Sequence, residues 1–359
     1  METLPCTLKI SGSKFFKALW NFPKYLFPFL LLSVIVIQSL WLSFLSDGKD
    51  EWTALIILFL ELWIYIIVFR SRTRIRLLTE NLYRISHMLS VHTIQRKHTL
   101  KLYIWVYCLF VTCGAVCFEL ALFNSGMIVQ DQYKLRNSGF VHGYLKEHLV
   151  AILSSAYALM ILIGNGFFAV LPGYYCFVCC CMKTFFLHFV CESRILIARQ
   201  DYRRILKIYK EMHETMIMME NFMNLPILVS VVNILITLFW FGYSFAFTPS
   251  VNNASGIFVA MGFIQYFVLL LVTLLPAAAV NQAATTARET VLSLPGWFPK
   301  QYSTIKVHVC REFMRKTTLT LWRIYRIDNS LLINALGTLI SYGFLVGTLG
   351  RVQNSNNEN

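Results

Sequence analysis

The chain has 359 residues, 57% of them hydrophobic, and its mean hydropathy is +0.59. This composition indicates a multipass membrane protein and excludes a soluble protein built on a single core. The net charge of +14 comes from Lys and Arg residues that lie between the apolar runs. Membrane topology explains that distribution, so nucleic-acid binding is not expected.

Seven apolar runs are long enough to span a bilayer, because a helix rises about 1.5 Å per residue and the hydrocarbon core is about 30 Å thick. The runs are 25–45, 52–69, 103–123, 149–171, 226–247, 257–280 and 331–349. The first is longer than the apolar core of a signal peptide, about 7 to 15 residues, and no small-residue cleavage site follows it. We therefore predict an all-α membrane protein with seven transmembrane helices.

The second, fourth and sixth of these helices are expected to continue beyond the membrane. After the second run, apolar side chains recur at spacings of three and four, at Ile75, Leu78, Leu82, Ile85 and Leu89. Pro172 and Gly173 are expected to end the fourth run. A second seam with the same spacing follows, at Ile195, Ala198, Tyr202, Ile205, Tyr209, Met212, Met216, Met219 and Met223. Such seams favour helix packing in water. Further on, the prolines of segment 295–299 break the chain, and a basic helical stretch is expected from there to the seventh run.

The distribution of positive charge predicts the orientation. Of the 32 Lys and Arg residues, 27 lie in four segments, which are 1–24, 70–102, 183–225 and 281–329. The positive-inside rule places these segments, and so the N-terminus, in the cytosol, and the C-terminus outside. The predicted parts are a cytosolic N-terminus 1–24, six spans with cytosolic helical extensions 25–280, a cytosolic anchor 281–329, a seventh span 330–350 and an extracellular tail 351–359.

The last apolar run has an unusual composition for a lipid-facing helix. Four glycines remove side-chain volume and four polar residues lie among them, namely Gly337, Gly343, Gly347, Gly350, Asn334, Thr338, Ser341 and Thr348. Such a helix packs against protein or lines water. Two interpretations stay open from these residues alone. One is a helix-packing face built on the GxxxG of Gly343 and Gly347, and the other is a pore-lining helix.

This run resembles the C-terminal signature of the insect-type (arthropod) gustatory receptors, in which Gly-Thr precedes Thr-Tyr, five apolar residues and Gln-Phe. The matching residues here are Gly337, Thr338, Ser341 and Tyr342, whereas Thr348 and Leu349 replace the Gln and Phe. The resemblance implies a ligand-gated cation channel of the plasma membrane that assembles as a homotetramer or a heterotetramer. Each seventh helix would line the pore, with Leu345, Thr348 and Leu349 at the gate, and the cytosolic helices would join the subunits.

The resemblance also implies a pocket for a small-molecule tastant among spans two to six, open to the outside. Candidate residues at suitable depth are Glu119, Tyr157, Trp240, Tyr243 and Gln265. Aromatic faces with a few polar groups suit small organic ligands or sugars. A sequon at Asn253 falls in a short outer loop and predicts glycosylation there.

Three other classes of protein agree less well with the sequence. A transporter needs broken helices in both halves, and Pro172 and Pro276 interrupt two later spans only. A G-protein-coupled receptor needs the opposite orientation, and its DRY-like and NPxxY motifs are missing. These two classes stay as alternatives. The histidines form no HExxH pattern and the Asp residues are isolated, so we expect no enzyme activity, no metal and no cofactor.

Overall fold

The computed structural model describes residues 49–89, 105–114, 143–247, 253–313 and 317–357, together with residues 32, 36, 116, 117 and 120. Within this part of the chain almost every residue is helical. Among the described residues, three helical stretches are long and apolar enough to cross a membrane, namely Ala169–Ala198, Tyr202–Phe245 and Gly256–Trp297. Of the first expected span, 25–45, the structure describes only residues 32 and 36, and of the third, 103–123, it describes residues 105–114, 116, 117 and 120.

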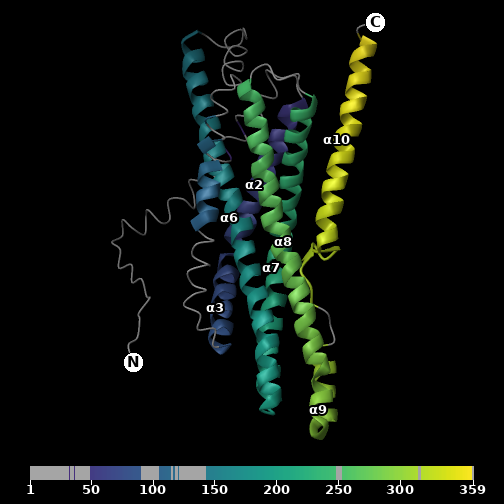
Figure 1. Cartoon of the computed structure of the whole chain (residues 1–359). Coiled ribbons are helices and arrows are strands. Elements are labelled where there is room, and N and C mark those ends of the chain that lie inside the picture. The colour runs from purple at the N-terminus through teal and green to yellow at the C-terminus, as the bar shows by residue number, and fades with distance from the viewer. Residues whose placement is uncertain are drawn as a thin grey trace, which may run out of the picture.

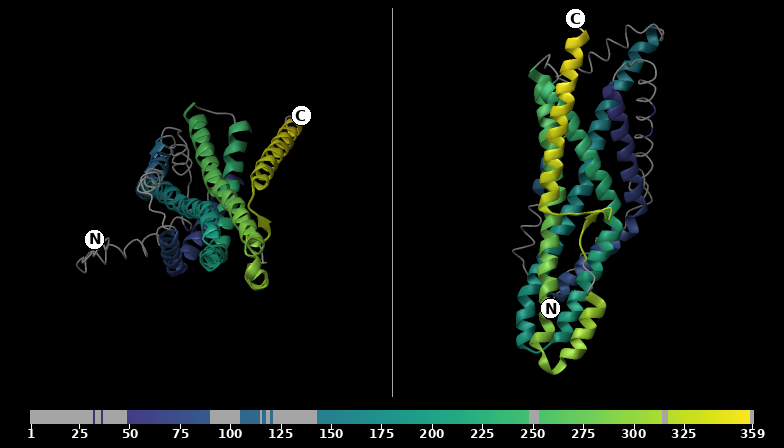
Figure 2. Two further views of the ribbon diagram at one scale, coloured as in Figure 1. Left: turned by 60° about the horizontal axis from the view of Figure 1, so that its bottom comes forward. Right: turned by 90° about the vertical axis from the view of Figure 1, so that its right-hand side faces the viewer.

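Three long helices form the centre of the molecule (Figures 1 and 2). They are α6 (Gly143–Ala198), α7 (Tyr202–Phe247) and α8 (Asn253–Trp297), and they pack against one another along their length. The expected spans at 226–247 and 257–280 are parts of α7 and α8. Each of these helices therefore extends well beyond the length that a bilayer requires.

The fourth span does not end at Pro172 and Gly173, as the sequence predicts, because α6 continues through both to Ala198. A proline inside a helix removes one backbone hydrogen bond and weakens that turn. Here the turn is supported from outside. The hydroxyl of Tyr107, in the helical stretch Trp105–Gly114, donates a hydrogen bond to the carbonyl of Ala169, and the Tyr107 ring packs on Gly173.

The two seams have different outcomes. Helix α2 (Lys49–Arg70) leads into α3 (Arg72–Met88), where Leu78 and Ile85 are fully buried, which confirms the first seam. The second seam is confirmed from Ile205 to Met223, where its side chains are buried. Its beginning is wrong, because Ile195 is 55% exposed and the helix breaks between α6 and α7. The break places Gln200 at a φ of 60°, and Asp201 then accepts a hydrogen bond from the backbone N–H of Arg204.

The segment after α8 departs most from the prediction. A 3₁₀ turn, η1 (Pro299–Gln301), and α9 (Tyr302–Phe313) follow α8, and then the chain forms a hairpin of β1 (Thr320–Leu321) and β2 (Tyr325–Arg326). The strands are antiparallel, with Thr320 opposite Arg326. The helix expected up to the seventh span is therefore interrupted. Burial explains the interruption, because the side chains of Leu319, Leu321 and Ile327 all enter the core.

The last helix, α10 (Asn329–Asn357), contains the predicted seventh span and continues into the segment expected as a tail. It starts at the hairpin and diverges from α7 and α8 toward the C-terminus (Figures 1 and 2). Its contacts with the core come from Leu331, Leu332, Leu336 and Leu339, which are only partly buried. The first half of α10 is thus attached to the bundle, and the second half stands apart from the described part of the chain.

Candidate functional site

The second half of α10 carries the residues predicted to form the gate. Leu345 is 53% exposed and Thr348 is exposed, and the Thr348 hydroxyl donates to the carbonyl of Leu345 over 2.9 Å. The side chain of Leu349 lies outside the described residues. Within the described structure this face is accessible, as a pore-lining face must be.

The signature residues lie on the same helix and are also exposed. Thr338 donates to the carbonyl of Asn334 over 2.8 Å, so its hydroxyl is satisfied within α10. A β-carbon on Gly337 or Gly343 would meet nothing within 4 Å. Ser341 and Tyr342 are both exposed, and Tyr342 is 58% exposed. Within the described residues, Gly337 and Gly343 are therefore not needed for packing of α10 against the bundle.

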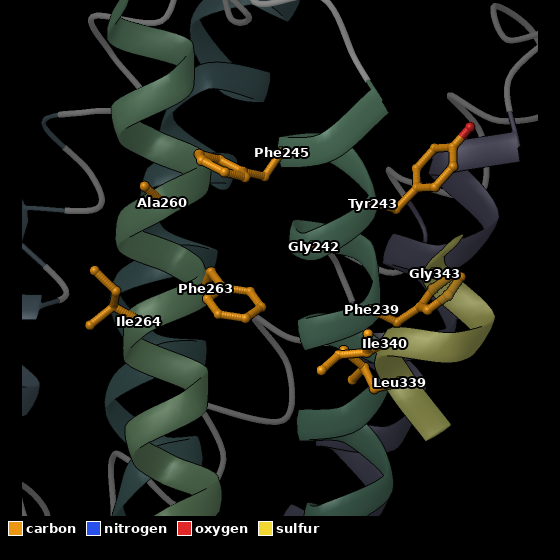
Figure 3. A pocket seen from close by; sticks show the side chains of 10 residues that line it. All are labelled: Phe239, Gly242, Tyr243, Phe245, Ala260, Phe263, Ile264, Leu339, Ile340 and Gly343. Atoms are coloured by element: carbon orange, nitrogen blue, oxygen red, sulfur yellow. The ribbon is translucent and has the colours of Figure 1, made fainter. Parts of the chain in front are cut away.

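A cavity of about 340 Å³ lies between α7, α8 and α10 (Figure 3). Figure 3 shows Phe245 of α7 and Phe263 of α8 turned toward the space between these two helices. Helix α10 closes one side with Leu339, Ile340 and Gly343. The lining is almost entirely apolar, and the volume lies in the range of small-molecule sites. A molecule in this cavity would contact the candidate pore helix directly.

The predicted ligand residues whose side chains the structure describes, Trp240, Tyr243 and Gln265, do not all line one cavity. Tyr243 lines the α10 cavity and stacks on Phe239, with the ring centroids 6.4 Å apart. Gln265 faces another way, because it is 4% exposed and its side chain lies 3.4 Å from the position of a β-carbon on Gly114. Trp240 packs edge-on against its neighbour Phe241. The side chains of Glu119, Tyr157 and Asn253 lie outside the described residues, although Asn253 itself begins α8.

A polar contact that sequence reasoning missed holds the hairpin to α8. Asn281 is 1% exposed, and its Nδ2 donates to the carbonyls of Leu319 and Ile327 over 3.0 and 2.8 Å. Its Oδ1 accepts from the backbone N–H of Leu319 over 2.7 Å. One side chain thus contacts the residues on both sides of the hairpin. The signal in the sequence is a single Asn directly after the apolar run 257–280.

A second polar contact holds the hairpin to α7. The carboxylate of Glu220 accepts from the backbone N–H of Thr320 over 2.9 Å and from the Thr320 hydroxyl. At the turn, Arg323 donates to the side-chain oxygen of Asn221 over 2.7 Å. Glu220 precedes the expected span 226–247, and burial raises its pKa above the usual range although these hydrogen bonds and Arg323 act in the opposite direction. The hairpin therefore bridges α7 and α8.

The start of α10 is also capped. The Asp328 carboxylate accepts from the backbone N–H of Leu331 over 3.0 Å and from the Ser330 hydroxyl over 2.7 Å. These hydrogen bonds hold the pKa of Asp328 below its usual range. A negative charge at this end also complements the helix dipole. The direction in which α10 leaves the hairpin is thus defined by local contacts.

This fold defines a class of membrane protein. Its long helices extend beyond the bilayer, and its C-terminal helix is attached separately. Solved structures share the fold, and two of them are compared with this chain. The insect olfactory receptor OR5 from Machilis hrabei matches with a TM-score of 0.61 and 13% identity, over 96% of this chain and 92% of that chain. The same receptor in complex with eugenol matches with a TM-score of 0.62 and 12% identity, over 97% and 93%. No protein-family model and no curated sequence matches the chain.

The predicted resemblance to insect chemoreceptors is therefore confirmed at the level of the fold. The likeness covers 96% of this chain and 92% of the other. At 13% identity it extends to the fold alone. The gustatory type, the tastant and the individual site residues stay predictions.

Proposed function

We propose that this protein is a chemosensory receptor that acts as a ligand-gated cation channel in the plasma membrane. The observation that carries the proposal is the combination of an insect olfactory receptor fold with an α10 whose second half presents Leu345 and Thr348 on an exposed face. Leucine side chains that line a narrow pore close it by excluding water. We propose that four copies of α10 surround the pore.

Exposure along α10 supports an assembly of several chains. Ile333, Ile340, Tyr342 and Leu345 are between 53% and 69% exposed, on more than one side of the helix. A helix that carries Asn, Thr and Ser among these residues is poorly suited to lipid on every side. Neighbouring copies would cover the apolar side chains and leave the polar ones facing a water-filled axis. A homotetramer and a mixed tetramer fit these observations equally.

We propose that the opening ligand is a small organic molecule, in keeping with the gustatory signature in α10. The insect olfactory receptor of the same fold was solved in complex with eugenol, which is such a molecule. For this chain the candidate contacts are Trp240, Tyr243 and Gln265, with Glu119 and Tyr157 as the predicted partners from other helices. Trp240, Tyr243 and Gln265 lie in more than one place around α7 and α8, so mutation of each candidate residue is needed to locate the pocket.

The test combines topology, assembly and conduction in the full-length chain. An epitope tag after Asn359 should be labelled in intact cells, and the protein should run in mild detergent at about four times 41.6 kDa. Cells should then show cation currents when sugars, bitter compounds or eugenol are applied. A tag labelled only after permeabilisation, or a strictly monomeric protein, would overturn the proposal.

A further inference from the structure

We propose that the β1–β2 hairpin couples the α7–α8 bundle to α10, and that Asn281 and Glu220 are the positioning residues of this coupling. The effect of this coupling on gating rests on the proposed channel function. The effect on the position of α10 does not rest on that function, because the position can be measured whether or not the chain conducts.

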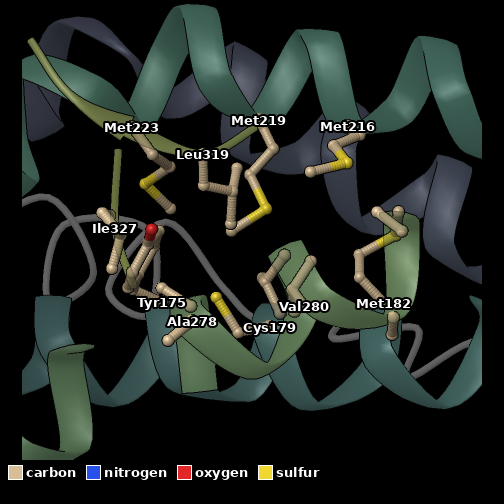
Figure 4. Packing of buried hydrophobic residues seen from close by; sticks show 14 of the residues in the cluster. Tyr175, Cys179, Met182, Met216, Met219, Met223, Ala278, Val280, Leu319 and Ile327 are labelled. Carbon is tan, nitrogen blue, oxygen red and sulfur yellow. The ribbon is translucent and has the colours of Figure 1, made fainter. Parts of the chain in front are cut away.

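One side chain, that of Asn281, holds both ends of the hairpin. Strands of two residues are too short to be stable alone, so the hairpin depends on external contacts. Asn281 supplies three hydrogen bonds to Leu319 and Ile327, and Ile327 lies two residues before the start of α10 at Asn329. Figure 4 shows Leu319 and Ile327 inside the core beside Met219 and Met223 of α7. The origin of α10 is therefore fixed to α8.

The hairpin is also held by a different helix. Two residues of α7, Glu220 and Asn221, hold the hairpin. Glu220 binds Thr320 of β1, and Asn221 binds Arg323 at the turn. A shift of α7 relative to α8 must either break one of these contacts or move the hairpin. Because Asn281 and Glu220 both bind backbone groups, the hairpin has little freedom to absorb such a shift through side-chain motion alone.

The turn itself indicates that its conformation is imposed from outside. Trp322 and Arg323 have φ values of 51° and 60°, and the N–H of Ile324 donates to the carbonyl of Leu321. Two successive residues of this kind form a turn that normally contains Asn and Gly, because other side chains are strained there. Here the turn is anchored to α7 through Arg323 and buried through Leu321. Such a strained element persists only where its surroundings hold it.

The length of α10 beyond the hairpin enlarges any tilt that begins at the hairpin. Leu345 lies sixteen residues after Asn329, or roughly 24 Å along a helix. A tilt of about 5° at the hairpin would therefore move Leu345 by roughly 2 Å. Within the described part of one chain the contacts that oppose this tilt are weak, because the α10 residues nearest the bundle are only partly buried and a cavity separates Gly343 from α8. A small movement at Asn281 and Glu220 is thus enlarged at the predicted gate.

The test measures the position of α10 by chemical labelling. A cysteine is introduced by Leu345→Cys, and intact cells expressing the full-length chain are treated with a charged, membrane-impermeant maleimide–polyethylene glycol. The labelling rate is followed by gel shift, with the parent chain as the background for its native cysteines. Surface biotinylation normalises the amount of protein, and no current is required for this readout.

Asn281→Leu and Glu220→Ala should each change the labelling rate by about fivefold or more, because each removes hydrogen bonds to buried backbone groups. The Glu220→Gln variant should be labelled at the parent rate, because its side-chain carbonyl still accepts a hydrogen bond from Thr320. Gln282→Glu is the matched control for Asn281, because it changes an exposed amide on the adjacent position of α8 and should leave the rate unaltered. The double variant should change the rate no more than the larger single variant, since both residues act through the same hairpin.

Labelling rates within about twofold of the parent in both Asn281→Leu and Glu220→Ala, at normal surface level, would overturn the coupling. If Asn281→Leu does not reach the surface, Asn281→Asp replaces it, because the acid keeps the acceptor for Leu319 and lacks the amide donors. If the double variant changed the labelling rate by the product of the two single-variant fold-changes, Asn281 and Glu220 would not act through the same hairpin. A protein that shows the expected labelling but never conducts would refute the proposed channel function and leave the coupling intact.

Discussion

The ring of Tyr107 occupies the space that a side chain on Gly173 would need. A β-carbon at Gly173 would stand 2.3 Å from Cε1 of that ring, a distance at which one of the two groups must move. The same tyrosine donates to the carbonyl of Ala169, one turn before Gly173. A close contact between two helices thus coincides with the proline-containing turn of α6.

Gly173→Ala is expected to destabilise the protein by about 1–3 kcal/mol through overpacking at this contact. The melting temperature of the purified protein in detergent should therefore fall by several degrees. Gly296→Ala is the control, because a β-carbon there would meet nothing within 4 Å. Tyr107→Ala combined with Gly173→Ala should remove the clash, so a double variant that loses as much as the sum of the single variants would contradict this reason.

Two buried asparagines should respond in opposite directions to the same substitution. Asn233 is 0% exposed, and neither its Nδ2 nor its Oδ1 has a hydrogen-bond partner in the described structure, whereas Asn281 makes three hydrogen bonds. Asn233→Leu should raise stability by about 1–3 kcal/mol, because it removes unpaired polar atoms, and Asn281→Leu should lower it by a similar amount. Thermal unfolding in detergent measures both. A loss of stability in Asn233→Leu would instead mean that Asn233 holds a buried water or polar ligand.

The stability of the protein should depend on pH through Glu220. Its folded pKa is raised, so its stabilising contribution is complete below the unfolded pKa of about 4.3 and is lost as the pH rises through the folded pKa. Glu220→Gln is uncharged at every pH and should therefore melt above the parent at neutral pH. This difference should shrink as the pH falls toward the unfolded pKa. Glu289→Gln, at an exposed position of α8, should show no such trend, and the same trend there would exclude Glu220 as its source.

Leu345→Ala is expected to increase current in the absence of ligand severalfold, because a smaller apolar side chain at a constriction admits water more readily. Whole-cell recording with matched surface expression measures the effect. Ile333→Ala is the control, since Ile333 is also exposed on α10 but lies three turns closer to the hairpin. Unaltered basal and evoked currents in a conducting Leu345→Ala channel would place the gate elsewhere.

Periodic burial was the feature that the sequence predicted well. Met212, Met216 and Met219 follow one another at helical spacing and are all buried, because spacing alone decides which residues share one face of a helix. The expected spans 226–247 and 257–280 also fall on α7 and α8, which are long and apolar enough to cross a membrane. These properties depend on residues that are close together in the chain.

Features that depend on distant residues were missed. The continuation of α6 through Pro172 is supported by Tyr107, which lies 62 positions before its hydrogen-bond acceptor. The hairpin is held by Asn281, 38 positions before Leu319. Depth along a span placed Tyr243 and Gln265 near one another, but depth does not determine on which side of a helix a residue lies. Tyr243 consequently lines the α10 cavity, and Gln265 faces Gly114.

The continuity of α7 limits how the chain can change in length. From Tyr202 to Phe247 there is no break, so Glu220 at the hairpin and Tyr243 at the cavity belong to one uninterrupted helix. One inserted or deleted residue between them would rotate one end relative to the other by about 100°. Either the contact with Thr320 or the wall of the cavity would then be lost. Substitutions along α7 can be absorbed one at a time, but changes in length are expected to be tolerated only before Tyr202 or after Phe247.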